Sequence, residues 1–325
     1  MAYEQEKQTA LEAVKKAAKL CASVQHNLIA ADTLEKKDRS PVTIADYGSQ
    51  AVISTMLARE LPKDALVGEE DSLELEKNTD MREKVYTLVK EQLESIDEAT
   101  MIKMIDRGNQ ETDYQSRYWT CDPIDGTKGF LRKEQYAVAL ALIEDGEVKL
   151  GVLGCPNLPL DFHNPTAGNG CILYAIRGKG AFMCDLEGED IVKITVDKLQ
   201  DPSRARFAES VESAHSAHSV HAQISEALGI TTEPLRIDSQ GKYAAVARGD
   251  VSIYLRYPKD DVYREKIWDH AAGLIIVEEA GGTVTDIYGK ALNFSLGRKL
   301  LENRGVVATN GTVHDKIIEV IGKVA

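Results

Sequence analysis

The residues best suited to chemistry lie in the stretch 119–130, which reads Trp-Thr-Cys-Asp-Pro-Ile-Asp-Gly-Thr-Lys-Gly-Phe. Two carboxylates, Asp122 and Asp125, stand three residues apart with Pro123 between them. Because proline fixes its own φ, both carboxylates and the Ile124 carbonyl oxygen can point to one side. Three oxygens that converge in this way suit a hard cation such as Mg²⁺.

The next residues favour a phosphate site beside that cation. A short apolar strand is expected to end at Cys121, and Gly126 and Thr127 are expected to open a helix whose free N–H groups can hold a phosphate. Metal ligands next to such groups indicate metal-assisted phosphoester hydrolysis. The ordinary alternative is an Asp-Pro turn followed by an Asp-Gly turn. The twelve residues together are too specific for that interpretation.

Three acidic residues elsewhere are candidates for completing this site, and each also has an ordinary structural interpretation. Asp46 stands near the start of a predicted helix that runs to residue 61, where it would complement the helix dipole. Glu69 belongs to Gly-Glu-Glu-Asp at 68–71, either a charged surface loop or the source of a third carboxylate ligand. Asp269, at the first turn of a predicted apolar helix, is either its N-cap or the last metal ligand.

Basic residues of the second half supply candidate anion contacts. Lys242 and Arg256 lie beside predicted strand ends and are either phosphate anchors or members of surface salt bridges. His215, His218 and His221 are spaced three apart on one predicted helix. They are zinc ligands, a solvated or capping face, or the source of one substrate contact. Zinc is disfavoured because no cysteine stands nearby.

The composition limits the classes of partner. The net charge of −13 over 325 residues argues against binding long nucleic acids or an anionic membrane surface. Five cysteines without a Cys-x-x-Cys pair indicate reduced, buried thiols. Neither a signal-peptide core nor an apolar run of bilayer length occurs. We therefore expect a cytoplasmic protein, acting as a monomer on a small molecule.

Hydrophobic periodicity predicts two domains that meet near residue 200. In residues 1–200, an α+β domain with the metal-binding motifs, we expect helices at 3–31, 46–61 and 80–96, a loop at 101–116, and strands at 65–67, 135–143, 147–153, 171–177, 180–184 and 191–196. Residues 201–325 predict an α/β domain with strands at 206–210, 235–237 and 251–256 and helices at 215–228, 239–248 and 267–280.

Several motifs resemble those of a known family. Asp-Pro-Ile-Asp-Gly-Thr at 122–127, Gly-Glu-Glu at 68–70 and Trp-Asp-His-Ala-Ala-Gly at 268–273 are similar to the lithium-sensitive, magnesium-dependent phosphatases of the inositol monophosphatase superfamily. The segments at 40–46, 154–157, 209–215, 238–243 and 265–270 resemble the 3′(2′),5′-bisphosphate nucleotidases within it. The resemblance extends from about residue 13 to residue 310. It implies an α/β fold, the layered αβαβα sandwich of the inositol monophosphatase and fructose-1,6-bisphosphatase type.

The resemblance also implies roles for individual residues. Two or three Mg²⁺ ions would be held by Glu69, Asp122, the Ile124 carbonyl, Asp125 and Asp269. Asp46 and Thr127 would orient and deprotonate the attacking water. The nucleotide would be bound by Gly126, Thr127, His215, Ser239, Lys242, Arg256 and Asp269. Two departures from the family pattern, Gly241 and Asn293, lie beside these positions and bear on specificity.

The implied substrate is a bisphosphate nucleotide, adenosine 3′,5′-bisphosphate, whose 3′-phosphate would be hydrolysed to leave AMP. Its sulfated form and 2′,5′-bisphosphates are further candidates. Two alternatives remain at this point. One is an inositol polyphosphate 1-phosphatase with the same metal chemistry, and the other is a phosphonucleotide-binding protein without catalysis. A pure binding protein has no need of a water-activating pair such as Asp46 and Thr127, which favours an enzyme.

Overall fold

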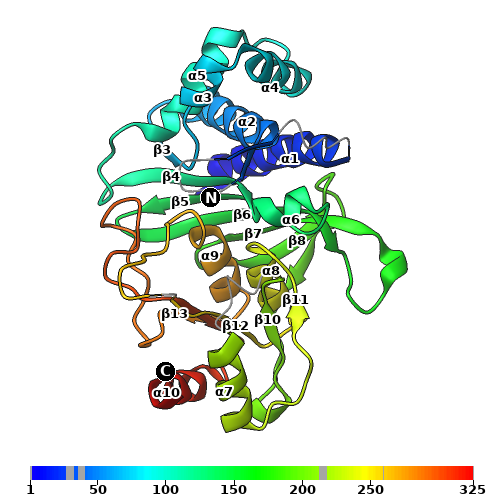
Figure 1. Cartoon of the computed structure of the whole chain (residues 1–325), viewed down its shortest axis with the longest axis vertical. Helices are drawn as coiled ribbons and strands as arrows, with labels where there is room; N and C mark the ends of the chain where they lie inside the picture. Colours follow the sequence, from blue (N-terminus) through cyan, green and yellow to red (C-terminus); the bar gives the residue numbers. More distant parts are fainter. Residues whose placement is uncertain (1, 27–32, 36–40, 212–217, 259, 325) are drawn as a thin grey trace.

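The computed structural model describes residues 2–26, 33–35, 41–211, 218–258 and 260–324. Helices and sheets alternate in it as layers, which follow one another from top to bottom in Figure 1. The first helical layer holds α1 (Glu4–His26) and α2 (Ile44–Glu60), with α3 (Leu73–Lys77), α4 (Thr79–Gln92), α5 (Glu98–Asp106) and the 3₁₀ turn η2 (Arg107–Asn109) beside them. A small antiparallel pair, β1 (Thr33–Glu35) and β2 (Pro41–Thr43), precedes α2.

The second layer is a seven-stranded sheet in the order β3-β4-β5-β6-β7-β8-β9. Only the β3–β4 pair is parallel. Its strands are β3 (Ala65–Gly68), β4 (Arg117–Asp125), β5 (Ala137–Glu144), β6 (Glu147–Pro159), β7 (Asn169–Ile176), β8 (Gly180–Asp185) and β9 (Val192–Ile194). Short helices α6 (Thr127–Leu131) and η3 (Pro165–Ala167) lie in the connections.

Side chains of β5 show why helices cover both faces of this sheet. Successive residues of a strand point to opposite faces. One set packs with α1 and α2, namely Val138, Leu140 and Leu142. The other set packs with helices from the second half of the chain, namely Ala137, Ala139, Ala141 and Ile143. A strand that is apolar on both faces reads as a continuous hydrophobic run, which is how the sequence predicted it.

The remaining three layers come from the second half of the chain. The middle layer is α8 (Gly241–Ala247) and α9 (Ala271–Glu279), and the second sheet has the order β11-β10-β12-β14-β13. Its strands are β10 (Phe207–Glu209), β11 (Leu235–Arg236), β12 (Ile253–Arg256), β13 (Thr283–Thr285) and β14 (Val306–Thr309). The outer helices are α7 (His218–Leu228) and α10 (His314–Val324), and η4 (Pro202–Arg204) precedes β10 (Figure 1). The predicted αβαβα sandwich is confirmed, whereas the division into two domains at residue 200 stays a prediction.

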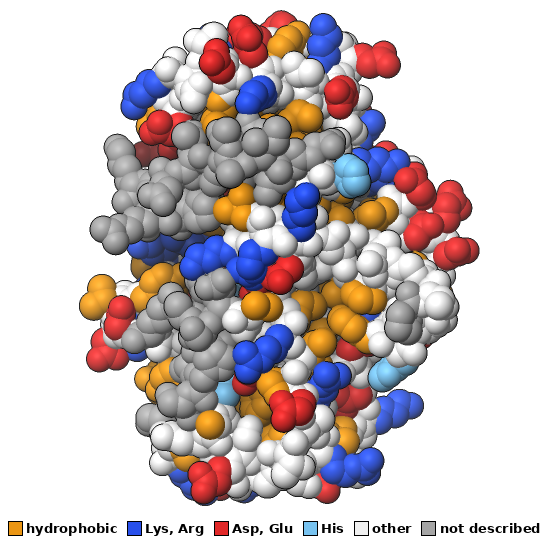
Figure 2. All heavy atoms as spheres, turned by 45° about the vertical axis from the view of Figure 1, so that its right-hand side comes forward, with side chains coloured by type: hydrophobic (Ala, Val, Ile, Leu, Met, Phe, Trp, Pro, Cys, Tyr) orange, Lys and Arg blue, Asp and Glu red, His pale blue; other side chains and the backbone are white. Residues whose placement is uncertain are grey.

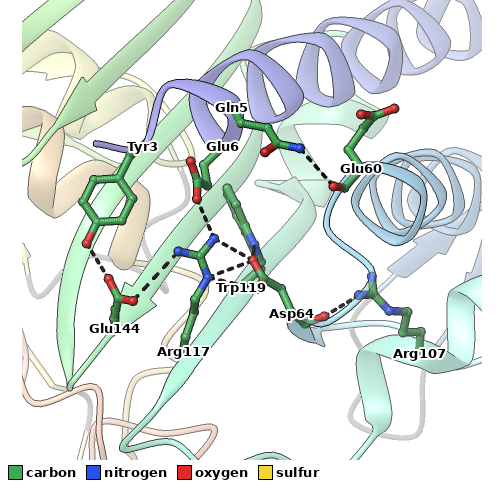
Figure 3. A network of polar contacts seen from close by, with 9 residues as sticks. All are labelled: Tyr3, Gln5, Glu6, Glu60, Asp64, Arg107, Arg117, Trp119 and Glu144. Atoms are coloured by element: carbon green, nitrogen blue, oxygen red, sulfur yellow. Dashed lines mark hydrogen bonds and ion pairs between the residues drawn. The ribbon is translucent and has the colours of Figure 1, made fainter. Parts of the chain in front are cut away.

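A polar network fastens the start of α1 to the first sheet, as Figure 3 shows. Arg117 on β4 lies at its centre and donates to Asp64 (2.8 Å) and to Glu6 (2.9 Å). Trp119 donates its indole N–H to the same Asp64 carboxylate at 2.9 Å. Arg107 donates to the Asp64 backbone oxygen, so the network extends to η2. It thereby fixes the 3₁₀ turn that packs beside the end of β3.

Several details differ from the sequence-based expectations. Residues 101–116 were expected to be a loop, but α5 and η2 occupy 98–109, and α5 is capped by the Asp97 side chain, which accepts from Thr100 N at 2.7 Å. β4 does not end at Cys121 but continues to Asp125. The middle helices begin later than predicted, at residues 241 and 271, so Ser239 and Asp269 precede them. Strands β13 and β14 and helix α10 were not predicted.

Candidate active site

An irregularity at the end of β4 brings its two aspartates to one side. Asp122 pairs with Ala139 and Asp125 with Ala137, so three steps along β4 match two steps along β5. Residues three apart on a regular strand face opposite sides, and one extra residue cancels this difference. Asp125 consequently acts electrostatically on Asp122. The sequence predicted the convergence of the two carboxylates but attributed it to a strand-to-helix turn.

Four carboxylates gather around that of Asp122, making a cluster of five. Burial first, and then the charges of Glu69, Asp125, Asp269 and Asp46, raise the pKa of Asp122 well above its ordinary value. Burial likewise raises the pKa of Asp269 well above its usual range. Like charges that share a desolvated site disfavour one another. A cation is therefore the natural partner of this cluster, and its oxygen donors are those that Mg²⁺ prefers.

Glu69 reaches the cluster from the neighbouring strand. β3 and β4 run parallel and their last paired residues are Gly68 and Cys121, so the residues that follow this pair, Glu69 and Asp122, lie side by side. Gln50 on α2 holds the following residue, since its Oε1 accepts from Glu70 N at 3.0 Å and its Nε2 donates to Glu70 O at 2.7 Å. Asn109 Nδ2 donates to the same carbonyl oxygen at 3.0 Å.

Asp269 comes from the second half of the chain and meets a cation there. It precedes α9, whose N-cap is His270, and its Oδ2 lies 3.6 Å from Arg256 Nη2. Arg256 Nε lies 2.7 Å from Glu265 Oε2, and His270 Nε2 lies 3.3 Å from the same oxygen. His270 Nδ1 in turn is 2.8 Å from the hydroxyl of Tyr243. Among the described residues, Glu265, Asp269 and His270 form a group with the spacing of metal ligands, but Glu265 is already paired with Arg256.

Lys242 is a buried cation on the same side of the site. Its Nζ donates to Ile237 O at 3.4 Å and lies 5.3 Å from the centre of the Tyr254 ring. Burial lowers the pKa of Lys242 to about 8, although Asp125 and Asp238 favour its charged form. Lys242 and Arg256 in turn oppose the burial that raises the pKa of Asp125. The structure thus joins both predicted cations to the carboxylate cluster.

The two halves of the chain touch at Gly126. Its φ is +87°, which favours glycine, and a Cβ there would lie 2.9 Å from Ser239 Cβ. Ser239 itself has a φ of +67°, and its hydroxyl accepts from Gly241 N at 3.1 Å. The adjacent Gln240 N donates to Asp125 Oδ2 at 2.5 Å. The 239–241 turn is therefore built against the motif that carries both aspartates.

The predicted water-activating residues lie next to this motif. Asp46 is buried in the first turn of α2, and its charge helps to raise the pKa of Asp122. Thr127 begins α6, and its hydroxyl donates to Ile124 O at 3.3 Å. Ser49, one turn after Asp46, donates to Pro123 O at 2.9 Å and so fixes α2 against the motif.

The predicted histidine group has a different outcome for each member. His215 lies outside the described residues, and His218 is the first residue of α7. His221 is buried, with Nδ1 2.9 Å from Glu209 and Nε2 3.2 Å from Leu255 O. Because both ring nitrogens of His221 have protein partners, it is a structural residue of α7 and not a zinc ligand.

The sequence reasoning missed several residues that hold the site together. Gln50 and Asn109 bind the backbone of Glu70, the residue after Glu69, and Glu265 pairs with Arg256. Only Glu265 had a sequence signal, as part of the motif at 265–270. The others are ordinary polar residues whose partners are distant in sequence.

Comparison with known proteins identifies the family. The sequence pattern of the inositol monophosphatase family matches residues 2–324. The chain belongs to the inositol monophosphatase family. A protein of Schizosaccharomyces pombe named 3′(2′),5′-bisphosphate nucleotidase is 44% identical, covering 98% of this chain and 95% of that protein. One of the same name from Dictyostelium discoideum is 46% identical, covering 97% and 95%.

Solved structures of inositol monophosphatases share the fold. An IMPase of Thermotoga maritima superposes with a TM-score of 0.66 at 23% identity, covering 98% of this chain and 97% of that one. The inositol monophosphatase of Anabaena gives 0.64 at 20% identity, covering 98% of both chains. The sequence-based assignment to this family and to its fold is therefore confirmed.

One face of the molecule carries local positive charge. Figure 2 shows Lys and Arg side chains across the middle of one face, whereas acidic side chains lie mainly toward its ends and right-hand edge. An anionic molecule can therefore find local positive charge on a chain of net charge −13. In the described part of the chain, no helix combines the length and the apolar character needed to cross a membrane.

Proposed function

We propose that the protein is a Mg²⁺-dependent phosphatase that hydrolyses the 3′-phosphate of adenosine 3′,5′-bisphosphate to leave AMP. The observation that carries the proposal is the cluster of Asp122 and four further carboxylates, with Lys242 and Arg256 beside it. The relatives named 3′(2′),5′-bisphosphate nucleotidase, which are 44% and 46% identical over nearly the whole chain, support the choice of substrate.

The donor set fits magnesium. Glu69, Asp122, Asp125, Asp269 and the Ile124 carbonyl are the proposed ligands of two or three ions. All are oxygen donors, as a hard cation requires. Burial first, and then neighbouring carboxylates, raise the pKa values of Asp122 and Asp269, and a cation would favour their charged forms. When bound, Mg²⁺ would neutralise phosphate charge and lower the pKa of water.

Asp46 and Thr127 are proposed to move the proton of the attacking water. A threonine hydroxyl is a poor base by itself, but it can accept a proton while its own passes to a carboxylate. Asp46 is buried beside Asp122, and Thr127 Oγ1 lies 3.3 Å from Ile124 O, so both line the same motif. Backbone N–H groups at Gly126 and Thr127 are proposed to bind the phosphate that is cleaved.

The nucleotide is proposed to lie across the two halves of the chain. Ser239 touches Gly126, which supports a position for the 239–241 turn beside the cleaved phosphate. Lys242 and Arg256 are proposed to bind the second phosphate, with Asp269 and His215 as further contacts. The guanidinium of Arg256 has a planar fork that suits phosphate oxygens. Action as a monomer in the cytoplasm is part of the same proposal.

Phosphate release tests the proposal against its two alternatives. Wild-type protein and Asp122→Asn are assayed with adenosine 3′,5′-bisphosphate, adenosine 3′-monophosphate and inositol 1,4-bisphosphate, each with Mg²⁺ and with EDTA. We expect wild-type turnover of the bisphosphate nucleotide in Mg²⁺ alone and none by the variant. Faster release from the inositol compound would indicate an inositol polyphosphate 1-phosphatase. Nucleotide binding without phosphate release in Mg²⁺ would indicate a binding protein.

A further inference from the structure

We propose that Arg298 is a positioning residue that holds two metal-ligand segments, one from each half of the chain, at the spacing a divalent cation needs. The segments are those of Glu69 and Asp269. The inference rests on the proposed function, because it takes these two carboxylates as ligands. It adds a residue that neither touches the substrate nor binds the metal.

Arg298 contacts the residue immediately before each carboxylate. Its Nη2 donates to Gly68 O, and its Nη1 donates to Gly108 O at 3.1 Å. Its guanidinium carbon lies 4.8 Å from the centre of the Trp268 ring. One planar side chain thus binds the peptide that leads into Glu69 and stacks on the side chain that precedes Asp269.

The backbone of Arg298 is joined to the second segment as well. Its carbonyl oxygen accepts from Ile267 N at 3.2 Å, and Leu300 N donates to Glu265 O at 2.9 Å. A β-bridge pairs Lys266 with Lys299 in the same place. Arg298 is therefore rigidly part of the Asp269 segment, and its side chain reaches from there to the Glu69 segment.

The Glu69 segment is packed so closely that its position depends on such contacts. A Cβ on Gly108 would lie 3.0 Å from Gly68 Cα and 2.8 Å from Gln50 Nε2, so η2 and β3 touch through glycine backbone. Gln50 holds the segment from the α2 side. Arg298 supplies the contact from the second half of the chain, 230 residues away in sequence.

Charge alone does not explain an arginine at this position. Burial lowers the pKa of Lys266, and the charges of Lys299 and Arg298 lower it further, while Asp269 and Glu69 act in the opposite direction. Lys266 therefore lies close enough to both ligands to repel an incoming Mg²⁺, and Arg298 adds positive charge beside it. What arginine offers and lysine lacks is a planar fork that donates to two carbonyl oxygens while its face stacks on an aromatic ring.

A charge effect and a positioning effect predict opposite changes in Mg²⁺ affinity when Arg298 is replaced, which makes the proposal testable. If Arg298 acted by charge, its removal would strengthen Mg²⁺ binding. If it positions the ligands, Arg298→Ala and the charge-conserving Arg298→Lys both weaken binding, by about tenfold or more, as is usual when a residue that orients metal ligands is lost. Lys299→Ala removes a neighbouring charge without touching the fork and is expected to leave binding unchanged or slightly stronger.

The experiment is a calorimetric Mg²⁺ titration of the whole protein without substrate. Arg177→Ala is the matched control for losing a bridging arginine, because Arg177 ties the first sheet to Glu278 at the far end of α9 at 2.6 Å. We expect wild-type Mg²⁺ affinity in that control. In phosphate release, the Arg298 variants should need more Mg²⁺ for half-saturation, while the substrate KM at saturating Mg²⁺ changes little.

Unchanged or tighter Mg²⁺ binding by Arg298→Lys would overturn the proposal. So would a loss of thermal stability equal to that of Arg177→Ala without a change in Mg²⁺ affinity, since that describes a purely structural arginine. If the wild-type protein takes up no Mg²⁺, the proposed function fails and this inference falls with it. If the wild type binds Mg²⁺ and both Arg298 variants bind it equally well, only the role of Arg298 is wrong.

Discussion

Replacing Glu265 by glutamine should weaken the folded state far more than replacing an exposed acid. Glu265 is 4% exposed, and its Oε2 lies 2.7 Å from Arg256 Nε and 3.3 Å from His270 Nε2. Burial by itself would raise the pKa of Glu265, but Arg256 and His270 lower it from the ordinary value of 4.5 to about 2. The buried position therefore favours the charged carboxylate.

The size of the effect follows from that pKa. A fall from 4.5 to about 2 corresponds to about 3 kcal/mol in favour of the charged form in the folded state, at about 1.4 kcal/mol per pKa unit. Glu265→Gln removes this stabilisation and leaves Arg256 with a longer contact to Asp269, at 3.6 Å. Breaking a buried pair by removing one partner costs about 3–5 kcal/mol in other proteins, which agrees with this value.

Urea unfolding in EDTA at several pH values measures the change. Because the folded-state pKa of Glu265 is lowered, its stabilisation is complete above pH 4.5 and is lost as the pH falls toward 2. We expect the wild type to exceed Glu265→Gln by about 3 kcal/mol in the free energy of unfolding, constant from about pH 7 to 5 and smaller below.

Asp261→Asn is the matched control. Asp261 pairs with Arg304 at 2.9 Å, but its side chain is 97% exposed, and surface pairs of this kind contribute about 0–1 kcal/mol. A loss by Glu265→Gln no larger than that of Asp261→Asn would refute the reasoning. A difference that already shrinks between about pH 7 and 5 would also refute it, since another group would then be responsible.

Three further changes probe the site. Asp122→Asn should abolish phosphate release yet raise the melting temperature of the EDTA-treated protein, because burial and neighbouring carboxylates raise the pKa of Asp122; an unchanged or lower melting temperature would contradict this. Since a raised carboxyl pKa makes ionisation oppose folding, the wild type in EDTA should lose stability above pH 3.8, and less so in the variant. Gly126→Ala should lower the free energy of unfolding by about 1–2 kcal/mol because of the left-handed backbone, and further because of the contact with Ser239. Gly178→Ala, with a φ of +76° and open space around it, measures the backbone contribution alone. Equal losses in urea unfolding would show that the contact contributes nothing. Lys242→Ala should raise the KM for the bisphosphate nucleotide more than the KM for adenosine 3′-monophosphate. An equal rise for both would mean that Lys242 does not bind the second phosphate.

The sequence predicted what depends on neighbouring residues. The apolar run of β5 and the Asp-Pro-Ile-Asp motif are local patterns, and the structure contains both. Helix α5 was missed because the long polar run that follows it, residues 106–117, suggested that the whole of 101–116 was a loop. Two local signals could have placed it, the N-cap Asp97 and the helical spacing of the apolar residues Met101, Ile102 and Ile105.

Contacts between distant segments could not be predicted from one sequence. Nothing near Arg298 indicates that its side chain reaches Gly68, and nothing near Gln50 indicates that it brackets Glu70. The bulge between Asp122 and Asp125 also depends on pairing with β5, not on the aspartates themselves. The motif identifies ligands, whereas the geometry between them comes from the packing of the layers.

The carboxylate cluster gives this packing a physical reason. Asp122 is buried, Asp269 is half-buried near it, and both have raised pKa values, so the folded chain without a cation holds repelling charges that the unfolded chain separates. Contacts from Arg256, Lys242 and the Gln240 backbone offset part of this repulsion at Asp125 and Asp269. A cation that binds only the folded cluster offsets the rest, and its binding free energy then adds to the stability of the fold. Residues that fix the ligand segments, such as Gln50 and Arg298, keep the repelling carboxylates from moving apart before the cation binds. A rigid scaffold of two sheets therefore suits a site whose ligands come from both halves of the chain.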